Sequence, residues 1–181
     1  VLDRPRLMER IRHALKRDRS YMICYNSTPI ERELSVKLGI PLYAVNPSLL
    51  KWGTKSGSRQ IFAEADVPHP DGSEDIWDVD GLAIATAELW ERQPHLKRVV
   101  VKLNEGFSGE GNALLDLRPI GEYAPDLASH RERTRILKDH FHALNFESKG
   151  ETWENFGSRI PELGAIVEAF VEGKVKRSPS V

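Results

Sequence analysis

RVVVKLNEGFSGEGNALLDL, residues 98–117, is the stretch that decides the fold. The run Val99–Val101 is β-branched and favours a strand, and the apolar run Ala113–Leu115 predicts a second strand. Between the two runs lies a short loop that holds three glycines. Strands this close in sequence predict an antiparallel hairpin with a glycine-rich tip.

The glycine-rich loop and Lys102 together favour a polyphosphate ligand. Glycines leave backbone N–H groups open to a close ligand, and Lys102 lies near the end of the first strand, beside the loop. Most loops of this kind bind nothing, however, and this one matches neither the P-loop pattern nor the dinucleotide fingerprint. The rest of the sequence must therefore decide between a phosphate site and an ordinary hairpin.

The composition is that of an ordinary globular protein without a basic excess. The chain has 181 residues, of which 40% are hydrophobic and 29% charged, and its net charge is −1. We therefore expect no nucleic acid among its partners, and no membrane, since no apolar run is long enough to cross one. The single cysteine, Cys24, fits a reducing compartment, so we expect a cytoplasmic location. The sequence begins with Val1 rather than methionine, and we expect a fragment of a longer protein.

The N-terminal part of the sequence predicts an α/β arrangement. Residues 2–17 have the apolar spacing of an amphipathic helix. Apolar runs at 21–25 and 41–45 predict two strands, the first of them buried, and the helix between the runs begins with a capping-box sequence at Thr28. A strand, a helix and a strand at this spacing predict that the two strands are parallel.

The remainder of the sequence predicts four more helices and one more strand. Apolar residues recur with helical period, and proline or glycine marks several of the boundaries. The helices are expected at 54–65, 78–93, 131–144 and 151–163, a loop at 118–130, and a strand followed by a break within 164–173.

Three separated stretches carry residues suited to nucleotide chemistry. Lys55 and Arg59 are four residues apart and therefore share one face of the helix that they open. Lys102 precedes the glycine-rich loop. The stretch 168–173 ends a strand with acidic and apolar residues and a glycine, which is typical of a hinge whose backbone groups can meet an adenine edge.

These stretches resemble, in order and approximate spacing, the amino-terminal half of an ATP-grasp domain. GTKSGSRQIFAEADVPHPDG (53–72), VVVKLNEGFSGEGNALLDL (99–117) and AIVEAFVEG (165–173) are similar to segments of peptide ligases of the pheganomycin type. The resemblance implies an α/β protein of two parts. Residues 1–50 would end a Rossmann-like pre-ATP-grasp domain, and residues 51–181 would form the first, nucleotide-binding part of an ATP-grasp α+β fold.

The resemblance also implies which residues contact the phosphates of ATP. Lys55 and Arg59 occupy the places of basic residues on the nucleotide phosphates. Lys102 matches the strand lysine that reaches the α-phosphate and the adenine. The flexible loop that closes over the β- and γ-phosphates corresponds to Phe107, Ser108, Gly109, Glu110 and Gly111.

The base and the ribose are implied to lie at the hinge. Glu168 and Val171 match positions whose backbone carbonyl and N–H groups contact adenine. Glu172 is the nearest acid for the ribose hydroxyls, because Lys174-Val175-Lys176 stands where many members carry that acid.

The activity implied by the resemblance is ATP-dependent carboxylate–amine ligation, which forms a peptide or other amide bond. A substrate carboxylate attacks the γ-phosphate to give an acyl phosphate and ADP, and an amine then displaces phosphate. The ligands for Mg²⁺ are expected beyond residue 181, so no catalytic or metal-binding residue is assigned within this sequence. We expect this fragment alone to be inactive.

Two alternatives to the ligase stay open at this point. The protein could be a non-catalytic nucleotide-binding module with an ATP-grasp-like fold, or an interaction domain that binds no nucleotide. The sequence does not indicate the carboxylate, the amine or the oligomeric state.

Overall fold

The computed structural model describes residues 1–106, 110–173 and 175. The protein divides into two compact units, Val1–Gly53 and Thr54–Val181.

The first unit contains two α-helices, α1 (Pro5–Ala14) and α2 (Pro29–Leu38), and a 3₁₀ helix, η1 (Pro47–Gly53). The predicted capping box of α2 is confirmed, because Thr28 and Glu31 bond each other's backbone and side-chain groups. The small core of the first unit is formed by residues from both helices and the segments beside them: Met8, Leu38 and Ile40, with Ile11, Leu15, Met22 and Leu34 packed around them.

The strands predicted at 21–25 and 41–45 do not form. The structure has only an isolated parallel bridge between Met22 and Leu42, so the parallel direction is confirmed but the strands are wrong. The side chain of Tyr25 is 89% exposed, and Tyr21 is exposed as well, which also contradicts the predicted burial of the first run. A parallel pair is stable when further strands flank it and both faces are covered, and the described residues of this unit supply no such strand.

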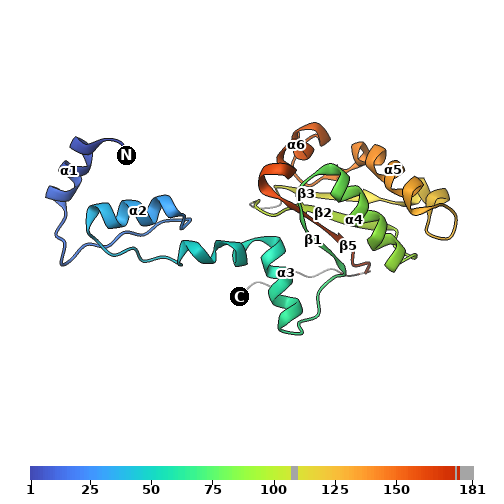
Figure 1. Ribbon diagram of the computed structural model, residues 1–181, viewed down its shortest axis with the longest axis horizontal. Helices are drawn as coiled ribbons and strands as arrows, with labels where there is room; N and C mark the ends of the chain where they lie inside the picture. The colour runs from blue at the N-terminus through green and yellow to red at the C-terminus, as the bar shows by residue number, and fades with distance from the viewer. Residues whose placement is uncertain (107–109, 174, 176–181) are drawn as a thin grey trace. The chain divides into compact units, whose positions relative to one another are not determined.

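The second unit is built on a five-stranded sheet with strand order β1-β5-β2-β3-β4, in which every neighbouring pair is antiparallel (Figure 1). The strands are β1 (Gly72–Ile76), β2 (Arg98–Leu103), β3 (Asn112–Asp116), β4 (Asn145–Phe146) and β5 (Ala165–Ala169). The predicted hairpin of β2 and β3 is confirmed. The second unit is thus a mixed α/β fold that is consistent with part of an ATP-grasp domain. All of the strand pairs described in its sheet are antiparallel.

Helices cover the sheet in two different ways. Along β2 the buried side chains Val99, Val101 and Leu103 alternate with partly exposed ones, so this face carries the core. That core is shared with α4 (Val79–Arg92), α5 (His130–His140) and α6 (Trp153–Leu163), and α4 and α5 run side by side in Figure 1. The helix α3 (Lys55–Glu64) packs instead on β1 and β5.

The sequence missed two strands and one helical turn of the second unit. The strand β1 reads Gly-Ser-Glu-Asp-Ile and lacks the apolar alternation of a half-buried strand, while β4 has only two residues. The segment predicted as a loop at 118–130 begins with a 3₁₀ helix, η2 (Arg118–Tyr123), and a second short one, η3 (Phe141–Ala143), follows α5.

A buried arginine fixes this irregular segment after β3. Arg133 lies on α5 with its side chain 1% exposed. Its guanidinium donates to the carbonyl oxygens of Tyr123 at 3.0 Å and Ala128 at 2.7 Å, and it forms an ion pair with Glu91 of α4. One side chain therefore satisfies carbonyls that no helix or strand ladder uses.

Replacing Arg133 with Met should destabilise the protein by about 2–4 kcal/mol, because buried carbonyls and the Glu91 carboxylate lose their donor. Urea unfolding measures the difference. Arg131→Met, at an exposed position on the same helix, is the matched control and should change the free energy of unfolding by less than about 0.5 kcal/mol. Equal effects of the two substitutions would contradict the structural role of Arg133.

Candidate functional site

The candidate site lies on the face of the sheet that the core helices leave open. Val100 and Lys102 alternate with the buried residues of β2 and so point to this face. Val100 is paired across the strands with Glu168 of β5 on one side and with Leu114 of β3 on the other. Lys102 is paired with Asn112 of β3. Residues far apart in the sequence thus meet on one surface.

Glu168 is the centre of the charged cluster on this face. The residue is 8% exposed, and its carboxylate accepts a hydrogen bond of 2.7 Å from Arg59 Nη1 and forms an ion pair with Lys102 Nζ. Burial alone pushes the pKa of Glu168 upward, but the bonds and charges of Lys102 and Arg59 outweigh it, so the net pKa lies below its ordinary value. The carboxylate is therefore ionised and holds two cations from different elements.

Arg59 is committed to neighbours inside the protein. The residue is 6% exposed on α3. Its Nε donates to Glu74 Oε2 at 3.1 Å and its Nη1 to the Pro70 carbonyl at 2.9 Å, in addition to Glu168. The guanidinium thus ties α3 to β1 and β5, and its contact with a nucleotide phosphate stays a prediction.

Lys55 is the cation of the cluster that makes no salt bridge within residues 1–106 and 110–173. It opens α3, whose first turn is capped by Thr54. Burial, followed by the positive charge of Lys102, lowers the pKa of Lys55, while Glu105 and Glu168 oppose that effect. Two lysines that repel each other over a partly buried surface favour an anion between them.

A cleft of about 470 Å³ borders this cluster. Its lining comes from β2, the end of β5 and the segment after it: Pro70, Val100, Lys102, Glu168, Ala169, Phe170, Val171, Glu172, Gly173 and Val175. The cleft combines an apolar floor with charged side chains at its border, which is the usual character of a small-molecule site.

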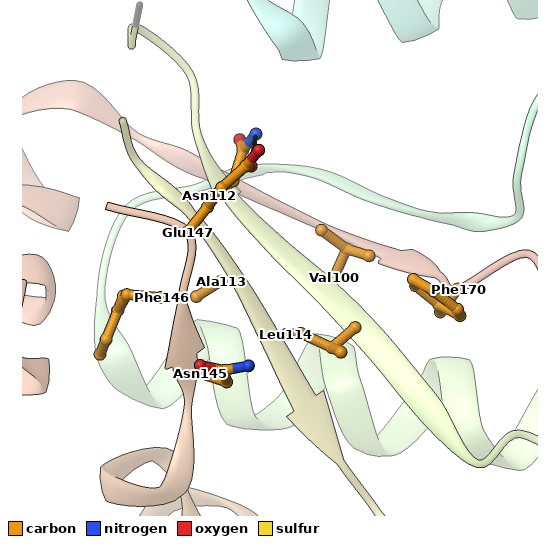
Figure 2. A pocket seen from close by; sticks show the side chains of 8 residues that line it. All are labelled: Val100, Asn112, Ala113, Leu114, Asn145, Phe146, Glu147 and Phe170. Carbon is orange, nitrogen blue, oxygen red and sulfur yellow. Dashed lines mark hydrogen bonds between the residues drawn. The ribbon is translucent and has the colours of Figure 1, made fainter. Parts of the chain in front are cut away.

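A second hollow, of about 290 Å³, adjoins the cleft and shares Val100 and Phe170 with it. Figure 2 shows Val100, Leu114 and Phe170 toward one end and Asn112 with Glu147 at the other. Asn112 Nδ2 donates to Glu147 Oε2 at 3.1 Å. The apolar part offers a floor for a flat ring, and the polar part lies at the level of Lys102.

The residues predicted around the hinge lie at the cleft. Val171 and Glu172 both line it, and Val171 is exposed. The carboxylate of Glu172 is held by Arg98, whose Nε lies 3.0 Å from Oε1 and whose guanidinium also sits over the Phe170 ring. The backbone role of Glu168 and Val171 and the ribose role of Glu172 stay predictions.

The predicted phosphate loop is described only at its two ends. Gly111 has a left-handed backbone (φ 81°), and a Cβ there would meet Leu103, so glycine suits this position. Glu110 borders a separate polar hollow of about 240 Å³, together with residues 148–151 and two residues of α6, Asn155 and Arg159. Phe107, Ser108 and Gly109 lie outside the described residues.

Several residues of the site gave no signal in the sequence. Glu74 belongs to β1, the strand that periodicity did not reveal. Phe170 lines the cleft, but nothing in the sequence distinguishes it from the rest of the hinge stretch. Asn104 directly follows β2 and is buried, although asparagine is typical of exposed turns. Its partners lie on α3, which sequence spacing does not reveal.

Neither a metal site nor a membrane span is found in the described part of the protein. Its residues contain no group of three or more His, Cys, Asp or Glu side chains that could hold a metal ion. Its helices include none that is long and apolar enough to cross a membrane.

Replacing Glu168 with Gln should lower the free energy of unfolding by about 3 kcal/mol at neutral pH, because Arg59 and Lys102 lose a buried counter-charge. The pKa of Glu168 is lowered in the folded state, so its stabilisation is present above the ordinary value of 4.5 and is lost as the pH falls through the lowered value. Urea unfolding between pH 7 and pH 3 should therefore show the wild-type advantage shrinking with acid. Glu162→Gln, at an exposed position, should show no such trend, and a constant difference for Glu168→Gln would contradict the assignment.

Comparison with known proteins identifies a family and two similar proteins. The family model described as IQCH-like, ATP-grasp matches residues 49–139. The chain is similar to IQ motif-containing protein H of Danio rerio, with 30% identity over 114 residues, which are 62% of this chain and 11% of that protein. It is also similar to L-propargylglycine--L-glutamate ligase of Streptantibioticus cattleyicolor, with 26% identity over 185 residues, which are 99% of this chain and 35% of that enzyme.

The chain thus spans about a tenth and about a third of the lengths of these two relatives. No solved structure matches it with significance. The family match covers half of the sequence and includes α3, β1, α4 and the β2–β3 hairpin. On this match, the chain belongs to the IQCH-like ATP-grasp family.

Proposed function

We propose that the open face of the sheet binds ATP. The observation that carries this proposal is that Lys102 and its ion-pair partner Glu168 both line the 470 Å³ cleft, with Lys55 near enough to Lys102 for their positive charges to repel. The triphosphate would lie against the two lysines, where its charge relieves their repulsion. The base would rest on Val100 and face the backbone of Glu168 and Val171.

The remaining predicted residues fit around this placement. The loop from Phe107 to Gly111 would close over the β- and γ-phosphates and exclude water. Arg59 would act mainly by holding Glu168, since its guanidinium already contacts three acceptors. Glu172 would accept from the ribose hydroxyls only if its carboxylate turned from Arg98 toward the cleft.

The reaction that we propose for the full-length protein is ATP-dependent carboxylate–amine ligation. The carboxylate oxygen would attack the γ-phosphorus and release ADP, and the amine would then attack the acyl carbon and release phosphate, leaving its proton to solvent. Similarity along nearly the whole sequence to an enzyme named for joining two amino acids supports an amino-acid-like substrate. Residues 1–50 would end a pre-ATP-grasp domain in this proposal.

A non-catalytic nucleotide-binding module is the second candidate. The described residues provide the cationic cluster and the cleft but no group of metal ligands, and no step of the reaction is assigned to a side chain of this protein. The relative from Danio rerio carries a name that states no reaction. Binding of ATP without turnover would follow from these residues alone.

The binding proposal is tested by thermal and urea unfolding of the full-length protein with and without Mg·ATP. Nucleotide at about 100 times its dissociation constant should add roughly 2.7 kcal/mol to the free energy of unfolding. Lys102→Met should abolish most of this gain, because it removes a cation from the phosphates. Lys97→Met, an exposed lysine just before the same strand, should keep the gain. No gain in the wild type at millimolar ATP would overturn the nucleotide site.

The two candidates differ in whether ADP is formed. Incubation of the full-length protein with ATP, hydroxylamine and a panel of amino acids should yield a hydroxamate and an equal amount of ADP with the right carboxylate, because hydroxylamine traps an acyl phosphate. Both products should require the carboxylate and be lost in Lys102→Met. Tight ATP binding with no ADP for any carboxylate would favour the module.

A further inference from the structure

Asn104 occupies a junction between three elements of the second unit. It directly follows β2 and lies two residues after Lys102. It is 6% exposed, and its Oδ1 accepts from Ser56 N at 3.2 Å and from Ser56 Oγ at 2.7 Å, on the first turn of α3. Its own N–H donates to the Gly164 carbonyl at 2.9 Å, just before β5.

The bonds to Asn104 replace those that a helix N-terminus usually makes to water. The first turn of a helix leaves four N–H groups without partners in the helix. In α3, Gly57 N donates to the cap Thr54 in the ordinary way, but Lys55 N donates to the Asn104 carbonyl at 3.4 Å and Ser56 N donates to Oδ1. A residue 48 positions away therefore sets where α3 begins.

The contacts of Asn104 are closely fitted on every side. Ser56 is 2% exposed, and its Oγ also accepts from Asp75 N at 3.0 Å, so β1 joins the same network. A Cβ on Gly164, which has φ +71°, would lie 2.4 Å from Asn104 Nδ2. A buried network of hydrogen bonds such as this one holds its members in one arrangement.

We propose that Asn104 is a positioning residue that clips the start of α3 to the end of β2 and thereby places Lys55 beside Lys102 for the phosphates of ATP. Lys55 is the first residue of α3, so the clip acts directly on its backbone. Each lysine comes from one of the two elements that Asn104 joins. The inference rests on the proposed nucleotide site for its consequence, but the placement of Lys55 can be measured without nucleotide.

The first test measures the titration of Lys55 without ATP. Lysines of the full-length protein are reductively methylated with ¹³C and followed by NMR against pH, and the Lys55 resonance is identified by its loss in Lys55→Arg. In the wild type the pKa of Lys55 should lie below the ordinary value of a lysine, because Lys55 is partly buried near Lys102 and the opposing Glu105 and Glu168 compensate only in part. Asn104→Ala should move the pKa of Lys55 toward the ordinary value of a lysine, and an unchanged titration would overturn the proposal.

The second test is a double-mutant cycle on ATP affinity. Asn104→Ala should weaken ATP binding about tenfold in the wild-type background and less than about twofold in Lys55→Met, because the clip acts through Lys55. Equal losses in both backgrounds would show a merely structural role and overturn the proposal. If the wild type binds no ATP, the proposed function fails while the titration still decides the clip.

Two further variants keep the tests decisive. Ser56→Ala removes only the hydroxyl of the network and replaces Asn104→Ala if that protein does not fold, with the same direction expected in both tests. Asp78→Ala removes the side-chain cap of α4, in which Asp78 Oδ1 accepts a hydrogen bond of 2.6 Å from Gly81 N. It should lower the melting temperature while leaving both the Lys55 titration and the ATP affinity unchanged. Changes of the same size in Asp78→Ala would attribute the effects to lost stability and overturn the clip.

Discussion

The buried carboxylate of Glu168 is the interaction on which the open face of the sheet depends. It holds Arg59 from α3 and Lys102 from β2 at the same time, so it joins a helix to the centre of the sheet. A charge in this position is stable only while it is paired, because desolvation costs more than any single hydrogen bond returns. The pairs therefore fix the helix, the strand and the border of the cleft together, and the cleft keeps its form without a ligand.

The pairing of Glu168 gives the three cations of the cluster different roles. Arg59 is enclosed and neutralised by Glu74 and Glu168, which suits a guanidinium with several donors in a fixed plane. Lys102 is partly exposed and shares Glu168, whereas Lys55 has no such partner among the described residues. A flexible ammonium can turn toward an incoming anion without breaking an internal bond. The cluster thus combines a structural cation with two that can contact a ligand.

Local chemistry in the sequence predicted the hairpin, the helices and the cap of α2, because β-branched runs, helical periods and capping residues act over a few positions. The site depended on a resemblance, since spacing cannot show that Arg59, Lys102 and Glu168 meet. The strand β1 was missed because its residues are polar, and the N-terminal strands were wrong because apolar residues alone do not supply partner strands. Tertiary contacts such as Ser56 with Asn104 leave no periodic trace at all.

The strand order has a consequence for synthesis on the ribosome. The hairpin of β2 and β3 can form as soon as it emerges, but among the strands of the described residues β1 is paired only with β5, where Gly72 lies opposite Glu168. During translation β1 must therefore wait, unpaired, until nearly all of the described residues have been made. An exposed strand edge invites pairing with other proteins, and charged residues discourage it. Glu74 and Asp75 interrupt the apolar alternation of β1. The same charges also protect the nascent protein from aggregation before β5 has been made.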